Sequence, residues 1–337
     1  MKILALQLKR IGDLVLTTPA LRRLHLAWPE AHIALGVMEG TAALLPAIPM
    51  IQAGIVFGRG RGFAPWQQTL TGGWDLCLDF TGNDRSALIT VLSRARKRVA
   101  FESIRKNKLR ALAYNVWSPS RVREEHTAQY YADLVTSALP GDVAVPDVDL
   151  VPELALPPRS RDAASAALEG TGATGPYALL HPGTARPEKY WLSERWKAVA
   201  AHLRETHGLS PIFTCGPDAY ERGHVAEADP NFKSPRDLLH LAALVERARI
   251  VVSCDTAVVH LASAFRVPQI ALFGPTNPFH WRPMHDRGLV ISAAQPDAPL
   301  AEFHPRMKGA PMDRISAEVV IRAIDGLLGR WSDGVME

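Results

Sequence analysis

Short apolar runs alternate with amphipathic stretches along most of the chain. The runs have the length of buried strands, and the stretches between them have apolar residues at helical spacing or a typical helix-start residue. We therefore predict strands at residues 2–8, 32–37, 54–57, 74–80, 98–101, 177–183, 211–216, 250–254 and 268–274. Helices are predicted after Thr18-Pro19, Asp84 and Ser193, and at residues 127–139, 236–247, 256–265 and 316–328. This alternation is typical of the α/β class, in which helices cover parallel sheets.

The alternation stops between Pro140 and Pro158. Five prolines lie there among short polar and apolar pieces, at positions 140, 146, 152, 157 and 158. Segments of this kind connect domains. We predict two α/β domains, residues 1–150 and 151–315, followed by a segment, 316–337, whose helix can cross back onto the first domain.

Composition excludes several classes of protein. No apolar run approaches the roughly 20 residues that cross a membrane as a helix, and the opening MKILALQLKRIGD is interpreted as a strand rather than a signal peptide. Cys77, Cys215 and Cys254 are too scattered for a disulfide framework or a zinc site, so we expect buried thiols in a reducing cytoplasm. No group of His, Cys and Asp has metal-ligand spacing along the chain. We expect neither a metal nor another cofactor.

The net charge of +4 is unevenly distributed. Residues 1–150 hold 18 Lys/Arg and 13 Asp/Glu, whereas the rest of the chain holds 20 and 21. Within residues 94–123 there are ten basic residues and one acid, Glu102. This concentration indicates either an anionic partner or a solvated helix face. No helix-turn-helix or aromatic-interleaved pattern supports nucleic acid as that partner.

The loops that follow strands are the expected ligand positions, because parallel α/β sheets bind ligands at the carboxyl ends of their strands. The first such loop is KRIGD, residues 9–13. Gly12 allows a tight turn and close approach of a ligand. Asp13 fits either a general base or the N-cap of the next helix.

The second loop is HPGTARPEKYW, residues 181–191. Gly183 and Thr184 suit an anion-binding turn, and Arg186 and Lys189 add positive charge. The loop has no Walker A pattern, G-x-x-x-x-G-K-[ST]. An ordinary basic surface loop is the alternative.

The third and fourth loops follow the strands at 250–254 and 268–274. In the third, Asp255 and Thr256 open a helix whose N-terminus suits a phosphate, with His260 one turn in. The alternative is a plain Asp cap with a packed histidine. In the fourth, Thr276 and Asn277 are candidate ligand contacts.

Four motifs in these loops occur in a recognisable order. They are I-G-D with T-x-P-A-L within residues 11–21, H-P-G-x-x-R-x-x-K-x-W at 181–191, D-T-x-x-x-H at 255–260, and F-G-P-T at 273–276. Each is weak alone. Together they cover nearly the whole chain and resemble glycosyltransferase family 9, the ADP-heptose:lipopolysaccharide heptosyltransferases.

The resemblance implies a GT-B architecture, with two facing Rossmann-like domains that each contain a parallel sheet. It implies inverting transfer without a metal, with Asp13 as general base and Lys189 as a catalytic cation at the donor diphosphate. Glu221 matches a family acid that holds the ribose. The expected donor-binding residues are Gly183, Thr184, Arg186, Glu221, Asp255, Thr256, His260 and Thr276. The expected acceptor-binding residues are Gly12, Arg105, Lys106, Lys108 and Arg110.

The chain departs from the family pattern in two places. Ala257 stands where the family usually has glycine, which implies a slightly different approach to the helix. The region before Met312 lacks the cysteines that many members carry.

From the resemblance we expect transfer of heptose from ADP-heptose to the inner core of lipopolysaccharide. The expected partners are an ADP-sugar and an anionic lipid-linked oligosaccharide, at the cytoplasmic face of the inner membrane, with peripheral membrane contact and no nucleic acid. One alternative is a GT-B transferase for another nucleotide sugar or glycan, and another is a non-catalytic nucleotide-sugar-binding protein. A nicotinamide oxidoreductase ranks third, because GRGRG at 58–62 is not G-x-G-x-x-G. Asp147 and Asp149 resemble a metal-binding pair, but lie in the proline-rich linker and are interpreted as solvated acids.

Overall fold

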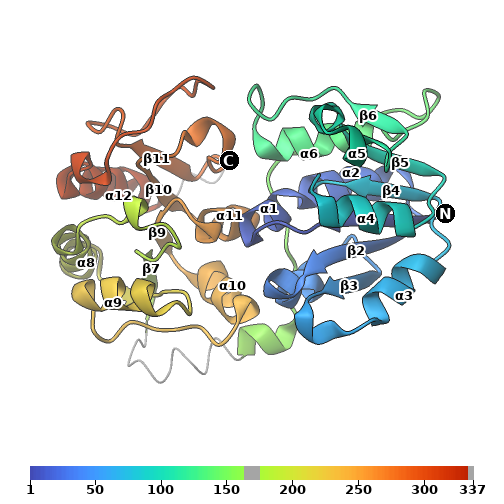
Figure 1. The fold of residues 1–337 in the computed structure, drawn as a ribbon. Helices are drawn as coiled ribbons and strands as arrows, with labels where there is room; N and C mark the ends of the chain where they lie inside the picture. Colours follow the sequence, from blue (N-terminus) through green and yellow to red (C-terminus); the bar gives the residue numbers. More distant parts are fainter. Residues whose placement is uncertain (163–174, 333–337) are drawn as a thin grey trace. The chain divides into compact units, whose positions relative to one another are not determined.

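The computed structural model describes residues 1–162 and 175–332. The chain divides into two compact units, Met1–Ala155 and Leu156–Glu337, and each contains one parallel sheet with helices packed on it (Figure 1). The division falls inside the proline-rich segment. Among the described helices, none combines the length and apolarity needed to cross a bilayer.

The first sheet has six parallel strands, in the order β3-β2-β1-β4-β5-β6. Their bounds are β1 Lys2–Gln7, β2 His32–Met38, β3 Ala53–Phe57, β4 Leu76–Asp79, β5 Lys97–Phe101 and β6 Val116–Ser118. The first five confirm predicted strands. Strand β6 was not predicted, because three residues are too few to establish a periodic pattern.

Helices cover both faces of this sheet. They are α1 Ile11–Leu16, α2 Thr18–Ala27, α3 Ala64–Thr71, α4 Asp84–Leu92, α5 Lys108–Ala111 and α6 Thr127–Thr136, with 3-10 helices η1 Glu39–Ala47, η2 Arg59–Arg61 and η3 Glu102–Lys106. Helix α3 packs with α4, and α2 packs with α6. Every residue of β1 after Lys2 is buried, as expected for a strand covered on both sides.

The helix predicted at Thr18-Pro19 is present as α2, with its N-cap one residue earlier than predicted. Helix α1, which begins at Ile11 directly after the loop of β1, was not predicted. Leu14 and Val15 lie three and four residues after Ile11 and are buried, which is helical spacing. Thr17 occupies the N-cap position of α2, so Thr18 is its first helical residue.

The second sheet, in the described part of the second unit, has five parallel strands in the order β11-β10-β9-β7-β8. Their bounds are β7 Tyr177–His181, β8 Ser210–Phe213, β9 Ile250–Cys254, β10 Gln269–Phe273 and β11 Gly288–Ser292. The helices are α8 Ser193–His207, α9 Ala219–Ala228, α10 Leu238–Arg247, α11 Ala257–Ala264 and α12 Ala317–Ser332, with η4 Pro187–Lys189, η5 Pro278–His280 and η6 Met312–Arg314. Strand β11 and helix α9 were not predicted.

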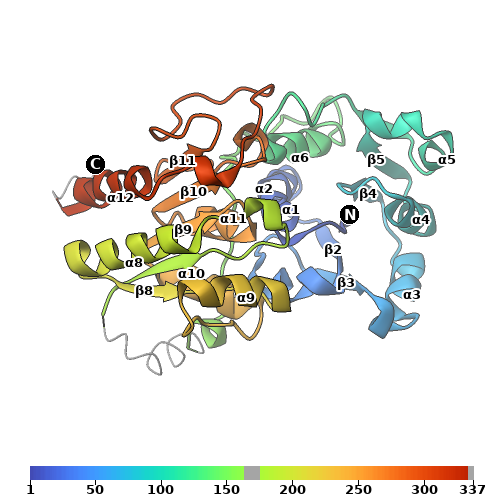
Figure 2. The same cartoon turned by 60° about the vertical axis from the view of Figure 1, so that its left-hand side comes forward.

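Helices α8 and α12 pack against each other in the second unit, as Figure 2 shows. The helix predicted after Ser193 is confirmed as α8, which buries Trp196, Val199, Ala200 and Leu203. Trp196 meets Trp191 edge-on at 5.1 Å between ring centroids. Ser193 was expected to be the N-cap of this helix, but it is not. Leu192 occupies that position, and the Ser193 hydroxyl instead donates to Glu227 at 2.9 Å. The crossing of the last helix onto the first domain stays a prediction.

The strand order of each sheet reverses at one point. In the first sheet the reversal lies between β1 and β4, and in the second it lies between β7 and β9. The loops that leave neighbouring strands at such a point diverge to opposite sides of the sheet, which opens a crevice for ligands. The loops after β1, β7 and β9 are therefore positioned for function.

Candidate active site

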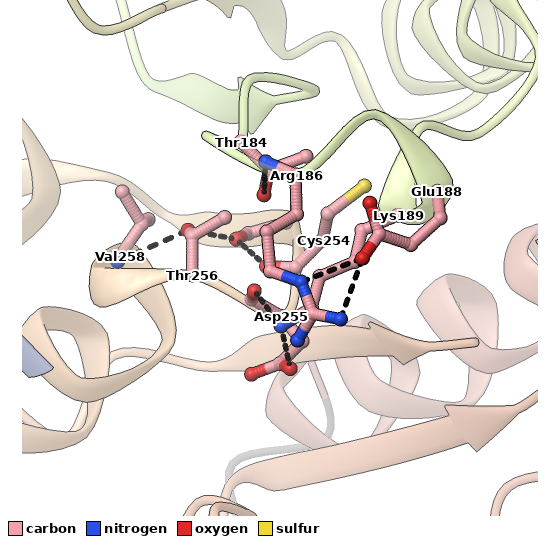
Figure 3. A network of polar contacts seen from close by, with 9 residues as sticks. Thr184, Arg186, Glu188, Lys189, Cys254, Asp255, Thr256 and Val258 are labelled. Carbon is pink, nitrogen blue, oxygen red and sulfur yellow. Dashed lines mark hydrogen bonds and ion pairs between the residues drawn. The ribbon is translucent and has the colours of Figure 1, made fainter. Parts of the chain in front are cut away.

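The loops after β7 and β9 meet through a buried ion pair. The strands are hydrogen-bonded neighbours, with His181 opposite Ser253 at their ends. Lys189 of η4 donates from Nζ to Asp255 Oδ2 at 2.5 Å and to the Asp255 backbone carbonyl at 3.3 Å (Figure 3). The two side chains are only 11% and 9% exposed. This pair holds a cation beside the start of α11.

The start of α11 is capped by Thr256. Its hydroxyl accepts a hydrogen bond from the Val258 backbone N–H at 3.3 Å (Figure 3). The alternative of an Asp cap is therefore wrong, because the Asp255 carboxylate pairs with Lys189 instead. His260 is buried in the second turn, with its ring 6.3 Å from that of Trp281. The helix N-terminus carries a partial positive charge close to the Lys189 ammonium.

Glu221 lies between the loops after β7 and β8. It belongs to the first turn of α9, where Asp218 is the cap, and its carboxylate accepts a hydrogen bond from the Gly216 backbone N–H. A Cβ atom at Gly183 would lie 2.0 Å from Glu221 Oε1, and one at Gly216 would lie 2.7 Å from Oε2. A side chain at either position would therefore displace the Glu221 carboxylate. Burial raises the pKa of Glu221, which the Gly216 hydrogen bond only partly offsets.

The remaining predicted donor residues have different surroundings. Thr184 is buried, and its hydroxyl accepts a hydrogen bond from the Arg186 backbone N–H at 3.3 Å. The Arg186 side chain forms an ion pair with Glu188 at 2.5 Å, with both about half exposed (Figure 3). Thr276 follows β10, and its buried hydroxyl oxygen has no hydrogen-bond partner among the described residues. The described structure thus brings Lys189, Asp255 and Thr256 together, and Gly183 with Glu221.

A cavity of about 520 Å³ in the second unit borders this region. It extends from the residues on either side of Lys189 to the loop after β10 and the segment before η6. Its lining residues are Glu188, Tyr190, Leu192, Pro275, Gly309, Ala310, Pro311, Met312 and Asp313. The volume is within the range of small-molecule sites.

In the first unit, Asp13 lies in the first turn of α1. The N-cap position is Arg10, which makes no side-chain cap hydrogen bond, so Asp13 is not the cap. Its Oδ1 instead accepts a hydrogen bond from the Tyr131 hydroxyl at 2.6 Å. Lys9 Nζ donates to the same hydroxyl at 3.3 Å. Burial lowers the pKa of Lys9, and the nearby carboxylates of Asp13 and Asp79 oppose that shift.

Tyr131 is a residue that the sequence analysis missed. It lies on α6, 118 residues from Asp13, and is fully buried. Burial and the Asp13 carboxylate raise its pKa well above the ordinary value, so the hydroxyl keeps its proton and remains a donor. The only signal in the sequence was its place on a predicted helix.

Asp79 is a second residue that was missed. It ends β4, beside β1, and is fully buried. It accepts hydrogen bonds from the Tyr114 hydroxyl at 2.5 Å and from the backbone N–H groups of Thr81 and Gly82 at 2.8 and 3.0 Å. These contacts fix the loop that lies next to the loop of β1.

The predicted acceptor residues other than Gly12 lie on η3 and α5. Arg110 forms an ion pair with Asp84 at the start of α4. Arg105 pairs with Glu102 at 3.4 Å, and its guanidinium lies 4.8 Å from the centroid of the Trp117 ring. Lys106 and Lys108 are exposed. Two leucines of the same segment are among the most exposed large apolar side chains described, Leu109 at 81% and Leu112 at 77%.

Comparison with known proteins identifies related sequences and folds. The profile of Glycosyltransferase family 9 (heptosyltransferase) matches residues 63–309. Lipopolysaccharide heptosyltransferase 3 of Escherichia coli is 25% identical, over 96% of this chain and 98% of that protein. Lipopolysaccharide heptosyltransferase 1 of Pseudomonas aeruginosa is 28% identical, over 82% of this chain and 80% of that protein.

Solved structures share the fold. A glycosyl transferase family 9 protein from Veillonella parvula has a TM-score of 0.80 and 22% identity, covering 98% of this chain and 97% of that chain. The ADP-heptose lps heptosyltransferase II of E. coli has a TM-score of 0.75 and 17% identity, covering 98% of this chain and all of that chain. The two α/β units, each with one parallel sheet, thus have the GT-B fold, as predicted.

Proposed function

The chain belongs to glycosyltransferase family 9, the heptosyltransferases, and from this membership we propose that it transfers heptose from ADP-heptose to the inner core of lipopolysaccharide. The observation that carries the proposal is the Lys189–Asp255 pair at the point where the second sheet reverses its strand order. A cation held beside a helix N-terminus suits a diphosphate leaving group.

The donor diphosphate would bind at Lys189 and the first backbone N–H groups of α11. A lysine ammonium has three N–H donors. Two of them are directed to the carboxylate and the carbonyl of Asp255, so the third is available to a phosphate oxygen. Asp255 acts through Lys189 in this scheme, because it orients the ammonium. Thr256, which shapes the helix start, completes the phosphate site.

The rest of the donor would extend over the neighbouring loops. Glu221 lies against Gly183 and presents a carboxylate that can accept hydrogen bonds from ribose hydroxyls. The cavity beside Lys189 offers space for another part of the donor. Thr276, His260 and Arg186 are further contacts in the proposal.

Asp13 is the proposed general base. The acceptor hydroxyl loses its proton to the Asp13 carboxylate while its oxygen forms a bond to the anomeric carbon of heptose. The bond from that carbon to ADP breaks, and the charge that develops on the diphosphate is stabilised by Lys189. Displacement in one step inverts the anomeric configuration and needs no metal. The Tyr131 hydroxyl orients Asp13 by its hydrogen bond to Oδ1. This scheme requires Asp13 and the bound donor to come together during the reaction.

The segment formed by η3 and α5 is the proposed contact for the acceptor and the membrane. An inner-core acceptor carries acidic groups and lies in a membrane with anionic head groups. Lys106 and Lys108 supply exposed charge, and Leu109 and Leu112 supply apolar side chains that can enter the head-group region. This combination supports a peripheral enzyme at the cytoplasmic face of the inner membrane.

The deciding experiment is turnover by the purified protein with ADP-heptose and a heptose-deficient lipopolysaccharide acceptor. Asp13→Asn should lower the rate by about 100-fold or more, because base catalysis typically contributes at least that factor. Donor affinity and the melting temperature should stay near those of the wild type. Asp142→Asn, which changes an exposed carboxylate in the linker, is the matched control. Near-normal turnover by Asp13→Asn would remove Asp13 from the role of base.

A panel of nucleotide sugars separates the alternatives. ADP-, GDP- and UDP-sugars are compared by thermal shift and by turnover with the same acceptor. Stabilisation and turnover by a GDP- or UDP-sugar alone would favour a transferase with another donor. Tight binding of a nucleotide sugar with no turnover on any acceptor would favour a binding protein.

A further inference from the structure

We propose that the second unit has a binding site for a divalent transition-metal cation such as Zn²⁺, formed by His202, His207 and Asp325. The Nε2 atoms of the two histidines lie 2.6 and 2.7 Å from the same carboxylate oxygen, Asp325 Oδ1. The ligand atoms of all three side chains lie within 4.8 Å of one another. The site joins the C-terminal end of α8 to α12, away from the loops proposed to bind the donor.

Tertiary packing creates this group. His207 is the last residue of α8, and Gly208 ends the helix in the left-handed conformation, with φ of 63°. His202 lies five residues earlier, and Asp325 comes from α12, which packs along α8. The two rings meet edge-on, with centroids 5.4 Å apart, and both Nε2 atoms are directed to Asp325. The sequence shows no metal-ligand spacing for this group, because the third ligand, Asp325, is 118 residues from its nearest partner, His207.

The donor set suits a borderline-soft cation. Two imidazole nitrogens and one carboxylate oxygen are typical ligands of Zn²⁺, whereas Mg²⁺ prefers oxygen ligands alone. In a tetrahedral zinc site the donor atoms lie about 3.3 Å apart. Each histidine Nε2 would therefore have to move about 0.6–0.7 Å farther from Asp325 Oδ1 to admit the ion. The carboxylate is 44% exposed and the histidines about one-fifth exposed, so solvent can supply a fourth ligand.

A hydrogen bond outside the group supports the ligand role of His202. Its Nδ1 lies 3.3 Å from the Thr206 hydroxyl on the same helix. When Nδ1 carries the proton and donates it to that oxygen, Nε2 has a free lone pair directed towards Asp325. A metal-binding histidine usually has such a partner on its second nitrogen, which fixes the tautomer and the ring orientation.

The consequence of metal binding would be a tighter connection between α8 and α12. Helix α12 contributes Val319, Val320 and Ile324 to the core of the second unit. A cation that binds the folded protein and not the unfolded chain raises its stability by mass action. The site would thus be structural, and turnover at moderate temperature would not depend on it.

The test is a titration of the metal-stripped full-length protein with ZnCl₂, with MgCl₂ as the comparison salt. We expect one zinc per chain and a melting temperature raised by about 5 °C or more at 100-fold excess over the dissociation constant. MgCl₂ should have no effect. His207→Gln should lose the bound zinc and the shift. His224→Gln is the matched control, because His224 lies 3.9 Å from Glu227 without a second histidine, and it should keep both.

Cobalt provides a readout that does not depend on melting. Co²⁺ bound to the wild type should give the intense visible absorption of a tetrahedral site, and Asp325→Asn should lose it while circular dichroism stays unchanged. Equal zinc binding by the wild type and His207→Gln, or no binding stronger than that of a free histidine, would overturn the proposal. Removal of metal by a chelator should leave glycosyl transfer unchanged below the melting transition. Loss of transfer that Zn²⁺ restores at that temperature would contradict the structural role.

Discussion

Replacing Lys189 with methionine removes the cation that faces Asp255 and retains most of the apolar stem of the side chain. The ammonium and carboxylate are 2.5 Å apart and about one-tenth exposed. At an effective dielectric constant of about 20, their attraction is roughly 7 kcal/mol before the cost of removing both charges from water. Breaking a buried pair from one side typically destabilises a protein by about 3–5 kcal/mol, because the other charge stays buried without a partner. We expect a loss of that size for Lys189→Met.

The assay is urea denaturation of the wild type, Lys189→Met, Asp255→Asn and the double variant. The double variant should be less destabilised than the sum of the single ones, because its second substitution removes the stranded group. Arg186→Ala is the internal control. Its partner Glu188 is about half exposed, so the loss should stay below about 1 kcal/mol.

Lys189→Met also tests the phosphate site. Loss of one charge-assisted contact should weaken the binding of ADP by about 1.5–3 kcal/mol, which is a 10- to 150-fold rise in the dissociation constant. Isothermal calorimetry measures it at a temperature where both proteins are folded. Two results would refute the reasoning. One is a stability of Lys189→Met equal to that of Arg186→Ala, and the other is unchanged ADP affinity.

Three further predictions concern other parts of the chain. Four basic residues of η3 and α5 are changed to Gln: Arg105, Lys106, Lys108 and Arg110. This change should raise the acceptor KM, flatten its salt dependence and leave the donor KM unchanged. Unaltered acceptor kinetics at low salt would show that the segment is only a solvated face. Tyr131→Phe should lower kcat less than Asp13→Asn does, with little change in donor affinity, and a kcat equal to that of the wild type would exclude a positioning role. Burial lowers the pKa of His181 to about 4. The contribution of neutral His181 to the free energy of unfolding is therefore fully present above the unfolded pKa of about 6.5. As the pH falls towards 4, this contribution is lost, which lowers the free energy of unfolding by up to roughly 3 kcal/mol. In urea titrations from pH 4 to 7, the free energy of unfolding of His181→Gln should lack this dependence on pH. An unchanged pH dependence would show that other groups cause it.

Local patterns sufficed for most of the secondary structure. The strand from Ile250 to Cys254 is a continuous apolar run, and the buried face of α8 follows from Trp196, Val199 and Leu203. Such periodicity reflects the burial that each element needs, so it can be recognised before the fold is known. The short strand β6 lacks enough residues for a pattern.

Helix ends were less predictable, because more than one residue near an end can satisfy the free backbone groups. Ser193 has the right side chain for a cap, yet it bonds to Glu227 and lies inside the helix. Asp255 also has a capping side chain, and the tertiary structure directs it to Lys189 instead.

The sequence by itself determined the alternation of strands and helices and the loops in which Asp13, Lys189 and Asp255 lie. Only the tertiary structure decided their partners. Lys189 meets Asp255 because β7 and β9 are neighbours in the sheet, and Asp13 meets Tyr131 because α6 packs on α1. The same packing joins His202 and His207 to Asp325. Contacts between residues this far apart depend on strand order and helix packing, which arise from the burial of the whole core and leave no periodic trace near either residue.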